Sequence, residues 1–484
     1  MSSVSNMIRF VLDDEVCEIC FNDKSSFSPT TTVLNFLRSL HFHKGVKEGC
    51  GEGDCGACTV VIAEENNNKL IYKAIDSCIM LLPALQGKQL ITVEDLAQKK
   101  NNITVLHPVQ KAIVENNGTQ CGYCTPGFVM SLFALYKNDY KPTREIVLDA
   151  FSGNLCRCTG YEPIINAAME VCSSKKKDRF DEREKDVIEK LKQIKQSTKT
   201  IEIETANQKY FKPFTFAEAK QLKSKYPDSL IISGATDVAL RVTKKHELIP
   251  LIIDFSDIDE LKQYQIKKNE IIFGAGMTLE SVKEISKKEL PALHEMLCVF
   301  GSKQIRNIAT LGGNVGSASP IGDTLPVLIA CDASVVLESV NKSREFKIVD
   351  FIKSYRQTQC LPNEFISKII IPRSGSDVTI KSYKISKRKT LDISTVSACF
   401  RLKRSKENKV SEIAIVYGGM AATTKHAVKA EAFLLGRTWT EKNIIQAIER
   451  IKEEFKPLSD ARAGEEYRRI AAGNLLMKFF NDIK

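Results

Sequence analysis

The stretch GCGEGDCGACTVVI, Gly49 to Ile62, places three cysteines and four glycines within ten residues and then becomes a run of strand-forming residues. These cysteines and the next one along the chain have the spacing C-x4-C-x2-C-x19-C. They are Cys50, Cys55, Cys58 and Cys78. This order is that of a plant-type [2Fe–2S] ferredoxin, and glycines let backbone N–H groups approach cluster sulfurs. The spacing therefore predicts an iron–sulfur cluster, with zinc or unligated thiols as the alternatives.

A second group of cysteines follows in two short motifs. QCGYCTPGF contains Cys121 and Cys124, and NLCRCTGYEP contains Cys156 and Cys158. Each pair precedes a segment with helical periodicity, and a helix N-terminus stabilises thiolates through its free N–H groups and partial positive charge. Two such pairs can hold another [2Fe–2S] cluster, although spacing alone leaves a zinc site open.

Length and composition indicate a globular protein of several domains. The chain has 484 residues, with 43 % hydrophobic and 27 % charged residues, which at roughly 100–200 residues per domain predicts three or four domains. The start, MSSVSNMIRFVLDDEV, lacks the features of a signal peptide, and no apolar run approaches the roughly 20 residues that span a bilayer. We therefore expect a cytoplasmic location, no membrane span, and cysteines that bind metal rather than form disulfides.

The net charge of +11 does not indicate nucleic-acid binding. Residues 1–173, which hold both cysteine motifs, carry 15 basic and 19 acidic side chains. No segment combines a basic stripe with interleaved aromatic residues. A solvated, lysine-rich surface explains the charge better.

The hydrophobic pattern changes several times along the chain. Residues 1–90 show short strands and one early helix, and residues 91–172 show five helical segments. Residues 173–200 are nearly all charged, with a thin apolar stripe, and predict a partly helical linker over the surface. Strands and helices mix from about residue 205, and three strands and two closing helices are expected after residue 378.

The remaining cysteines and the histidines form no convincing ligand set. Cys17 and Cys20 form a CxxC, but on an alternating strand they point to opposite faces and cannot easily share a metal. We expect them, and the cysteines without a nearby partner, to be small apolar core residues. The latter are Cys172, Cys298, Cys331, Cys360 and Cys399. The histidines at positions 41, 43, 107, 246, 294 and 426 show no metal-binding spacing.

Both cysteine motifs, in this order, resemble those of the molybdenum hydroxylases, the xanthine dehydrogenase and aldehyde oxidase family. The resemblance continues through SGATDV, ATLGGNVGSASPIGDTLPVL and IPRSGSDVTIKSYKISKRKTLDIS, and so covers nearly the whole chain. It implies a multidomain α+β fold and strengthens the prediction of the second cluster. The implied parts are a plant-type ferredoxin β-grasp domain (1–90), a helical [2Fe–2S]-binding domain (91–173), a charged linker (174–204), a PCMH/VAO-type FAD-binding domain (205–377) and a CO dehydrogenase flavoprotein-like α/β sandwich domain (378–484).

The flavin region has only weak signals of its own. No GxGxxG follows a first strand, but glycine turns at Gly234 and at Gly312–Gly313 follow apolar runs and can present N–H groups to a pyrophosphate. Alone, each turn is more often structural. The resemblance implies that the FAD phosphates lie against Ile231, Ile232, Ser233, Gly234, Ala235, Thr236, Asp237, Val238, Thr310, Gly313 and Asn314.

The resemblance also implies contacts with the rest of the cofactor. It places Asp323 near the ribityl chain, Lys384 near the flavin ring and Phe300 against the cofactor. The alternatives are a plain core phenylalanine at Phe300 and a solvent-exposed strand lysine at Lys384. The loop KRKTLDIS departs from animal relatives, since only Asp392 remains where adjacent acidic residues are expected. A less negative surround favours an anionic reduced flavin and an anionic dinucleotide, and leaves the electron acceptor open.

The implied function is electron transfer between a partner chain and a dinucleotide. A molybdopterin-binding large subunit would oxidise hypoxanthine and xanthine to urate, and electrons would pass through two [2Fe–2S] clusters and FAD to NAD⁺. The combination resembles the small subunit of the family's bacterial members, with two small and two large subunits. It places Cys158 against the pterin and Gln120 nearby, and no catalytic acid or base in this chain. The alternatives are the same role in another molybdenum hydroxylase, acting on an aldehyde or N-heterocycle, and a stand-alone ferredoxin-like electron carrier.

Overall fold

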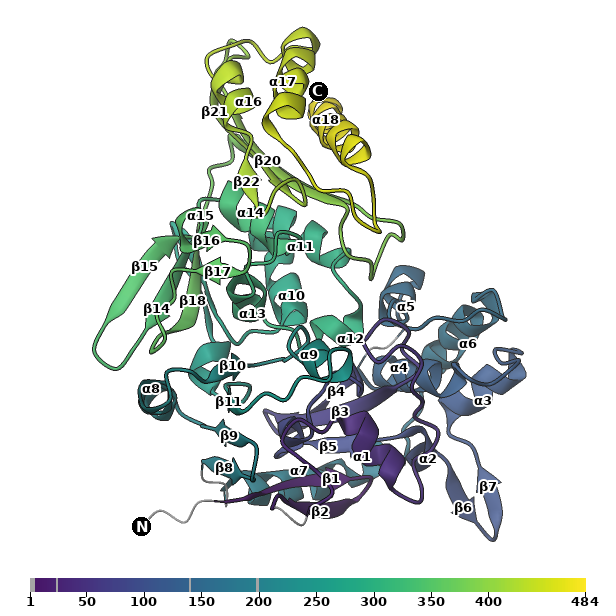
Figure 1. The fold of residues 1–484 in the computed structure, drawn as a ribbon. Helices are drawn as coiled ribbons and strands as arrows, with labels where there is room; N and C mark the ends of the chain where they lie inside the picture. The colour runs from purple at the N-terminus through teal and green to yellow at the C-terminus, as the bar shows by residue number, and fades with distance from the viewer. Residues whose placement is uncertain (1–4, 23–24, 139–140, 197–199) are drawn as a thin grey trace. The chain divides into compact units, whose positions relative to one another are not determined.

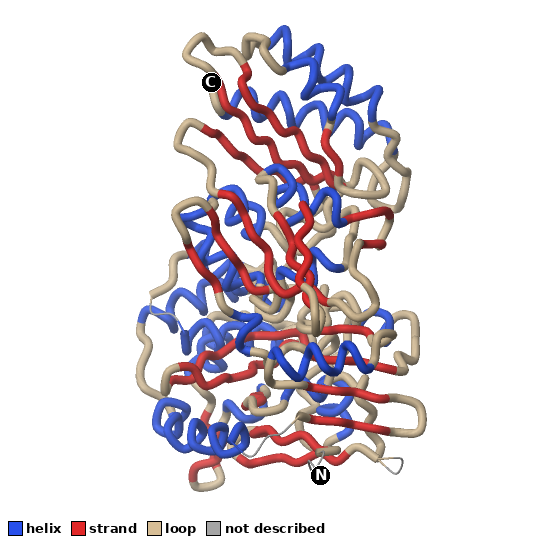
Figure 2. Tube along the Cα trace, turned by 90° about the vertical axis from the view of Figure 1, so that its left-hand side faces the viewer, coloured by secondary structure: helices blue, strands red, loops and turns tan. Residues whose placement is uncertain are grey.

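The structure is a computed structural model that describes residues 5–22, 25–138, 141–196 and 200–484. The chain divides into two compact units, each built from separate segments. Unit 1 comprises Met1–Phe214, Asp228–Asp257 and Ser302–Ala309; unit 2 comprises Thr215–Pro227, Ile258–Gly301 and Thr310–Lys484. Figure 1 labels the helices and strands of both, and Figure 2 shows the strands in red. Among the described residues, no helix has the length and apolar character that a bilayer crossing requires.

A five-stranded mixed sheet opens unit 1. Its order is β2-β1-β5-β3-β4, with β1 and β5 parallel and the other neighbours antiparallel. The strands are β1 (Met7–Leu12), β2 (Glu15–Cys20), β3 (Thr59–Asn66), β4 (Lys69–Asp76) and β5 (Gln89–Ile91). Helix α1 (Val33–Ser39), capped by Thr32, packs Phe36 edge-on against Phe10 of β1, with ring centroids 5.8 Å apart. The short η1 (Leu82–Leu85) precedes β5. The expected strands and early helix are confirmed.

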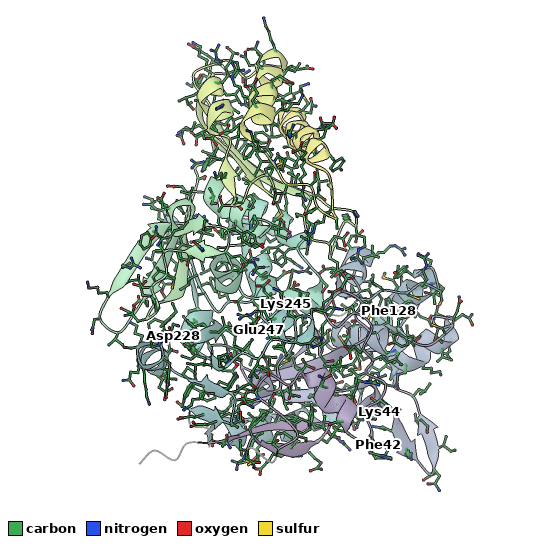
Figure 3. The ribbon with its side chains drawn as sticks, viewed as in Figure 1. Phe42, Lys44, Phe128, Asp228, Lys245 and Glu247 are labelled. Atoms are coloured by element: carbon green, nitrogen blue, oxygen red, sulfur yellow. The ribbon has the colours of Figure 1, made fainter. Side chains whose placement is uncertain are left out.

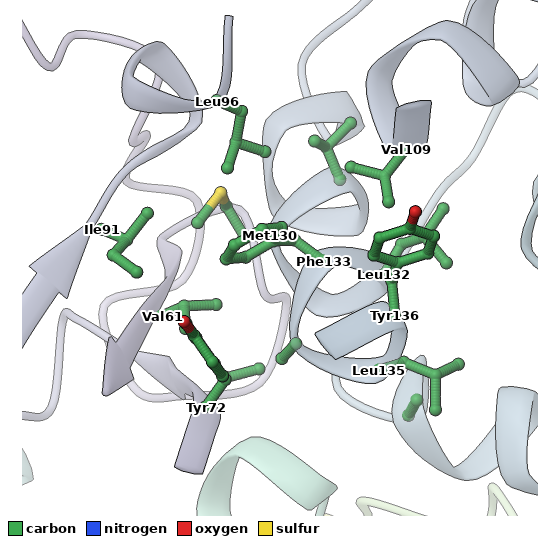
Figure 4. Packing of buried hydrophobic residues seen from close by; sticks show 14 of the residues in the cluster. Val61, Tyr72, Ile91, Leu96, Val109, Met130, Leu132, Phe133, Leu135 and Tyr136 are labelled. Carbon is green, nitrogen blue, oxygen red and sulfur yellow. The ribbon is translucent and has the colours of Figure 1, made fainter. Parts of the chain in front are cut away.

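Helices form the next part of unit 1 and share one hydrophobic cluster with that sheet. They are α2 (Val93–Leu96), α3 (Pro108–Glu115), α4 (Thr125–Asn138), α5 (Arg144–Ala150) and α6 (Glu162–Ser173). Figure 4 shows Met130 and Phe133 of α4 close to Val61 and Tyr72 of the sheet, within one buried hydrophobic cluster. All five predicted helical segments are present.

A small hairpin between α2 and α3 was not predicted. It pairs β6 (Gln98–Lys100) with β7 (Ile103–Val105). Asn101 and Asn102 make the turn with φ values of 50° and 61°, the backbone of a two-residue hairpin turn. The Asn-Asn pair was therefore the available signal.

The charged segment forms a helix whose apolar stripe is buried. Helix α7 spans Arg179–Gln196, and Phe180, Val187 and Leu191 are among its buried residues. They belong to the same hydrophobic cluster as α4. The expected stripe is confirmed, but it contributes to the core, so the description as a linker on the surface is wrong for this helix.

A four-stranded sheet, in the order β10-β11-β9-β8, completes unit 1. Its strands are β8 (Ile201–Glu204), β9 (Lys209–Lys212), β10 (Leu230–Ile232) and β11 (Leu251–Asp254). Unit 1 also contains the short helices α9 (Ala239–Thr243) and α12 (Lys303–Arg306). Ile203, Tyr210 and Ile252 of this sheet share a buried cluster with Phe10 and Ile62 of the first sheet. The two sheets therefore enclose one core.

Unit 2 contains a second five-stranded sheet, ordered β12-β13-β18-β14-β15 with antiparallel neighbours. Its strands are β12 (Tyr264–Ile266), β13 (Glu270–Gly274), β14 (Ser334–Glu338), β15 (Ser343–Lys347) and β18 (Phe365–Pro372). Its helices are α8 (Phe216–Lys225), η2 (Asp259–Lys262), α10 (Leu279–Glu289), α11 (Pro291–Cys298), α13 (Leu311–Gly316), α14 (Thr324–Ala330) and α15 (Ile348–Phe351). β16 (Ile352–Ser354) and β17 (Gln357–Thr358) form a separate short pair.

The end of the chain forms an antiparallel sheet with helices packed on it. The strands β19 (Val378–Ile385), β20 (Val396–Arg404), β21 (Val410–Gly418) and β22 (Lys425–His426) follow one another in space. The helices are α16 (Val428–Leu434), α17 (Glu441–Glu454) and α18 (Glu465–Asp482). One hydrophobic cluster joins Phe400 of β20 to Ile444 of α17 and Phe479 of α18. The predicted strands and closing helices are confirmed, as is the multidomain α+β architecture.

Candidate functional site

The glycine-rich loop at Gly49–Cys58 directs backbone N–H groups at the first candidate ligand. The Sγ of Cys50 accepts from the N–H groups of Glu52, Asp54 and Cys55 at 3.5, 3.2 and 3.3 Å. Gly51, Gly53 and Gly56 have φ values of 64°, 76° and 68°, which only glycine adopts freely. The glycines therefore make the turns that encircle the sulfur.

The four predicted thiols of this region lie together in unit 1. Hydrogen bonds from the thiols of Cys55 and Cys78 hold the pKa of Cys50 well below its usual range. A hydrogen bond with the thiol of Cys78 likewise lowers the pKa of Cys58. The hydrogen bonds to these acceptor sulfurs, together with burial, raise the pKa of Cys55 and of Cys78. Cys58 and Cys78 are each 2 % exposed. Cys58 is the last residue of the loop, and Cys78 lies two residues after the end of β4. Four thiols joined by hydrogen bonds in this way fit the donor set of an iron–sulfur cluster.

A buried carboxyl group lies beside these thiols. Asp76 is 0 % exposed, and the thiol of Cys58 lies 3.8 Å from its Oδ1. Burial, with the nearby thiols, raises the pKa of Asp76 well above its usual range. Nothing in the sequence pattern had marked this residue.

The second set of cysteines meets at two helix starts. Cys121 and Cys124 precede α4, and Cys156 and Cys158 precede α6. The Sγ atoms of Cys158 and Cys121 are 3.7 Å apart. Two sulfurs bound tetrahedrally to one metal at about 2.3 Å lie roughly 3.8 Å apart, so this pair fits one metal. Among the described residues, however, no three Cys, His, Asp or Glu side chains gather around a single ion position.

Local contacts of this set fit a bound anionic cluster. The Sγ of Cys156 accepts from the N–H groups of Cys158 and Thr159, both at 3.4 Å, and from the Thr159 hydroxyl at 3.2 Å. Burial raises the pKa of Cys156, but these hydrogen bonds outweigh it and the pKa is lowered. Gly122 and Gly160 have φ values of 80° and 71°, and a Cβ added to either would meet nothing within 4 Å. The space needed next to the sulfurs is therefore open.

Direct hydrogen bonds join the two cysteine regions. The N–H of Leu155 donates to the carbonyl of Cys55 at 3.0 Å, and the hydroxyl of Tyr123 donates to the carbonyl of Glu48. Buried Asn154 donates to the carbonyl of Gly56 at 3.2 Å. Close by, the ring of Phe128, labelled in Figure 3, packs edge-on against Phe151. Asn154 was not singled out from the sequence, although it lies just before the CRC motif.

The first glycine turn of the flavin region lies in unit 1, beside the first cysteine loop. Of the predicted residues Ile231–Val238, Gly234 approaches the backbone so closely that an added Cβ would lie 1.8 Å from the carbonyl oxygen of Ile308. Ala235 has a φ of 56°, which is rare for a residue with a side chain. Lys244, at the end of α9, donates to the carbonyl of Cys50 and lies 3.7 Å from Glu52. The helix that follows the turn is thus hydrogen-bonded to the cysteine loop.

The second glycine turn begins α13 in unit 2. Thr310 caps the helix by accepting from the N–H of Gly313 at 3.2 Å. A Cβ on Gly312 would lie 2.5 Å from the Cβ of Ala275. Gly312 is therefore required by packing against Ala275, whereas a Cβ on Gly313 would meet only the hydroxyl of the capping Thr310 within 4 Å, at 2.9 Å. The side chain of Asn314, which was also predicted, accepts from the Thr324 hydroxyl at 2.6 Å.

Asp323 and Lys384, predicted separately, form a buried ion pair in unit 2. Their side chains are 6 % and 2 % exposed, so Lys384 is not a solvent-exposed strand lysine. Lys384 Nζ also donates to the carbonyl of Val299 at 2.9 Å, and the Ser394 hydroxyl donates to Asp323 at 2.5 Å. Phe300, next to Val299, is half-buried.

The remaining acidic residue of the loop after Lys384 is neutralised. Asp392 accepts from the N–H of Arg388 at 2.8 Å and from its Nε at 2.6 Å. Burial raises the pKa of Asp392, but the hydrogen bonds from Arg388 outweigh it and the pKa is lowered. The loop therefore contributes little net negative charge.

The other cysteines divide into two classes. Cys172, Cys331 and Cys399 are buried, as predicted for core residues. Cys20 is exposed and Cys17, Cys298 and Cys360 are half-buried. The prediction is wrong for Cys20, because β2 is an edge strand with little covering it.

Comparison with known proteins supports the assignment by region. Residues 92–169 match the family model "[2Fe-2S] binding domain", residues 201–374 match "FAD binding domain in molybdopterin dehydrogenase", and residues 381–483 match "CO dehydrogenase flavoprotein C-terminal domain". A chain in the structure of carbon monoxide dehydrogenase from Hydrogenophaga pseudoflava is 25 % identical, with a TM-score of 0.53, over 56 % of this chain and 94 % of its own. A chain of quinoline 2-oxidoreductase from Pseudomonas putida 86 shares the fold, with 22 % identity and a TM-score of 0.52 over 56 % of this chain and 95 % of its own.

Similarity to longer proteins covers almost the entire chain. Xanthine dehydrogenase of Emericella nidulans is 32 % identical over 95 % of this chain and 38 % of its own length. Xanthine dehydrogenase/oxidase of Gallus gallus is 32 % identical over 93 % of this chain and 38 % of its own length. The chain thus spans less than half the length of these relatives. It carries a [2Fe-2S]-binding domain, an FAD-binding domain and a CO dehydrogenase flavoprotein C-terminal domain, and it is homologous to a portion of the xanthine dehydrogenases.

Proposed function

We propose that this chain is the iron–sulfur and flavin subunit of a cytoplasmic xanthine dehydrogenase. Electrons from a molybdopterin centre on a partner chain would enter at Cys121, Cys124, Cys156 and Cys158, continue to Cys50, Cys55, Cys58 and Cys78, and reach NAD⁺ through FAD. When bound, the clusters carry single electrons, and FAD accepts two and releases them as a hydride.

The observation that carries the proposal is the order of contacts within unit 1. Leu155, next to Cys156, donates to the carbonyl of Cys55, and Lys244, in the helix after the Ile231–Val238 turn, donates to the carbonyl of Cys50. The first cysteine loop therefore contacts both the second cysteine region and the end of the helix that follows the candidate phosphate turn. These contacts support a relay from the second cysteine set through the first to FAD.

The side chains of this chain would hold and orient the cofactors rather than take part in acid–base chemistry. Backbone N–H groups at Cys50 and Cys156 would stabilise the negative sulfurs. The turn at Gly313, where no backbone atom lies within 4 Å of an added Cβ, would admit the pyrophosphate. Lys384, held by Asp323, would place a positive charge near the flavin ring. We assign no catalytic acid or base here.

A separate molybdopterin subunit is part of the proposal, as a complex of two small and two large chains. Cys121, Cys158 and Gln120 are exposed, which fits a surface that meets the pterin. The match to the carbon monoxide dehydrogenase chain covers 94 % of that chain but only 56 % of this one. This supports the view that enzymes of this kind divide their domains over several separate chains.

The main rival is the same role in another molybdenum hydroxylase, acting on an aldehyde or N-heterocycle. The structural match to quinoline 2-oxidoreductase shows the shared fold alone. A stand-alone ferredoxin-like carrier is a weaker rival, because residues 201–374 match an FAD-binding family.

The decisive experiment is to isolate the native complex and identify its second chain. We expect a molybdenum-containing chain, one FAD per copy of this chain, and NAD⁺ reduction driven by xanthine. Quinoline or aldehyde oxidation without xanthine oxidation would replace the substrate assignment, and a complex without FAD would refute the relay.

A further inference from the structure

A thiol and an imidazole outside the cofactor sites form an aligned pair in unit 2. The Sγ of Cys298 lies 3.4 Å from Nε2 of His294, one turn earlier on α11. The other ring nitrogen, Nδ1, lies 2.8 Å from the carbonyl oxygen of Lys283 on α10. A carbonyl oxygen only accepts, so Nδ1 carries the proton, and Nε2 is left to accept from the thiol.

This is the arrangement of an activated nucleophile, in which a base contacts the nucleophile and a third group orients the base. Both residues are half-buried rather than enclosed in the core. The charged neighbours on the two helices are already paired, Lys283 with Glu280 at 2.8 Å and Glu295 with Lys381 at 3.4 Å. His294 is therefore the group placed to take the thiol proton.

The pair adjoins the residues proposed to hold the flavin. Cys298 is followed by Val299, whose carbonyl accepts from Lys384 at 2.9 Å. Cys298 is therefore one residue away from the carbonyl that accepts from Lys384. Helix α11 is also hydrogen-bonded to β19, the strand that contains Lys384: the Ser382 hydroxyl donates to the carbonyl of Ala292 at 2.7 Å.

We propose that Cys298 is a reactive thiol, activated by His294, whose modification by hydroperoxides or electrophiles slows the flavin end of the relay. The second part rests on the proposed function. In the reaction with hydrogen peroxide, the thiol proton passes to Nε2 and the sulfur attacks one peroxide oxygen. The S–O bond forms as the O–O bond breaks, and the departing hydroxide takes the proton from the imidazolium to give water. Sulfur is oxidised by two electrons to the sulfenic acid, and the peroxide is reduced.

Cys360 provides a matched control within the same unit. It is half-buried like Cys298, but its thiol donates to the carbonyl of Glu364 at 3.4 Å rather than to a base. Burial raises the pKa of Cys360 to about 11. The two cysteines therefore have the same degree of burial and different hydrogen-bond partners.

The test treats the full cofactor-loaded chain with hydrogen peroxide and a sulfenic-acid trap, or with iodoacetamide, and follows each cysteine by peptide mass spectrometry. We expect Cys298 to react roughly tenfold faster than Cys360, and His294→Gln to remove most of that difference. Equal rates at the two cysteines, or a full rate in His294→Gln, would overturn the proposal. This readout does not require FAD, so it is independent of the proposed function.

A second measurement tests the link to the flavin. After peroxide treatment we expect flavin reduction by NADH to slow in the unmodified sequence and in Cys360→Ser, but not in Cys298→Ser. Oxidised Cys298 with an unchanged reduction rate would overturn the regulatory part. A chain without bound FAD would instead contradict the proposed function and leave the labelling result standing.

Discussion

The Lys384 ammonium lies 2.9 Å from the Asp323 carboxylate, and the two side chains are 2 % and 6 % exposed. Removing one partner of a buried ion pair leaves the other charge uncompensated and costs about 3–5 kcal/mol, whereas removing both costs less. We expect Lys384→Met to lower the free energy of unfolding by about 3 kcal/mol, and Lys384→Met with Asp323→Asn to recover part of it. Urea unfolding of the single and double variants measures this coupling.

The same lysine is expected to control the flavin's reactivity. Its positive charge favours the reduced flavin, so Lys384→Met is predicted to keep FAD but to react more slowly with NADH. Stopped-flow reduction provides the rate at equal FAD content. An unchanged rate and flavin potential would show that the lysine acts only in stability.

The adjacent glycines of α13 provide a matched pair for the phosphate turn. A Cβ on Gly313 meets only the Thr310 hydroxyl within 4 Å, but one on Gly312 would lie 2.7 Å from the Ala275 carbonyl oxygen. We therefore expect Gly313→Val to lose FAD with both clusters retained and a small drop in melting temperature from the displaced Thr310 cap, and Gly312→Ala to lower the melting temperature more. Flavin absorbance and thermal unfolding distinguish the two, and full FAD occupancy in Gly313→Val would reject the phosphate turn.

The cysteine sets are predicted to hold two separate clusters. About four irons and four acid-labile sulfides per chain are expected, since each [2Fe–2S] cluster holds two of each. Cys55→Ser is predicted to remove one EPR signal and Cys124→Ser the other, with FAD retained in both. Stoichiometric zinc without iron in anaerobically prepared protein would contradict the assignment.

The parts of the fold that sequence reasoning predicted have strong local signals. The alternation in Met7–Leu12 and the apolar spacing in Glu441–Glu454 each predicted the right element. The hairpin at β6 and β7 was missed because each strand has only three residues, β6 is polar, and Ile103 and Val105 of β7 are exposed. The pattern therefore shows no buried face. The contribution of helix α7 to the core was underestimated, because its few buried apolar residues are spread among many charged ones.

The candidate sites differ in the same way. The cluster cysteines have a spacing that can be recognised within the motif itself, whereas Asp323 and Lys384 lie far apart in sequence and meet only through the fold. Asn154 and Lys244 connect loops distant in sequence. No local pattern encodes such contacts, so only the resemblance or the structure could find them.

A buried carboxylate in unit 1 predicts a pH dependence of stability. Asp178 accepts from His107 Nε2 at 3.0 Å and from Lys137 Nζ at 2.9 Å. Burial raises the pKa of Asp178, but these partners outweigh it and the pKa lies well below its usual range. A carboxyl whose pKa is lower in the folded state stabilises the fold above its unfolded pKa, near 4, and this contribution is lost as the pH falls further.

We therefore expect Asp178→Asn to lower the free energy of unfolding by about 2–4 kcal/mol at pH 7 and by much less near pH 2. Urea unfolding at both pH values gives the difference. The exposed pair Lys111–Glu115 serves as the control, since Glu115→Gln is expected to change stability by less than about 0.5 kcal/mol at either pH. A loss that is equal at both pH values would mean that the carboxylate charge is not the cause.

The proposed division of work between this chain and a molybdopterin subunit gives the last prediction. Cys121 and Cys158 are exposed, whereas Cys58 and Cys78 are buried, which fits electrons entering through the second set from another chain. Purified alone, the cofactor-loaded chain is expected to pass electrons from NADH to artificial dyes but not to oxidise xanthine. Adding the partner should restore xanthine-driven NAD⁺ reduction, and Gln120→Ala should slow that reaction without changing the NADH–dye rate. Xanthine turnover by this chain alone would refute the division, because it would place the substrate site here.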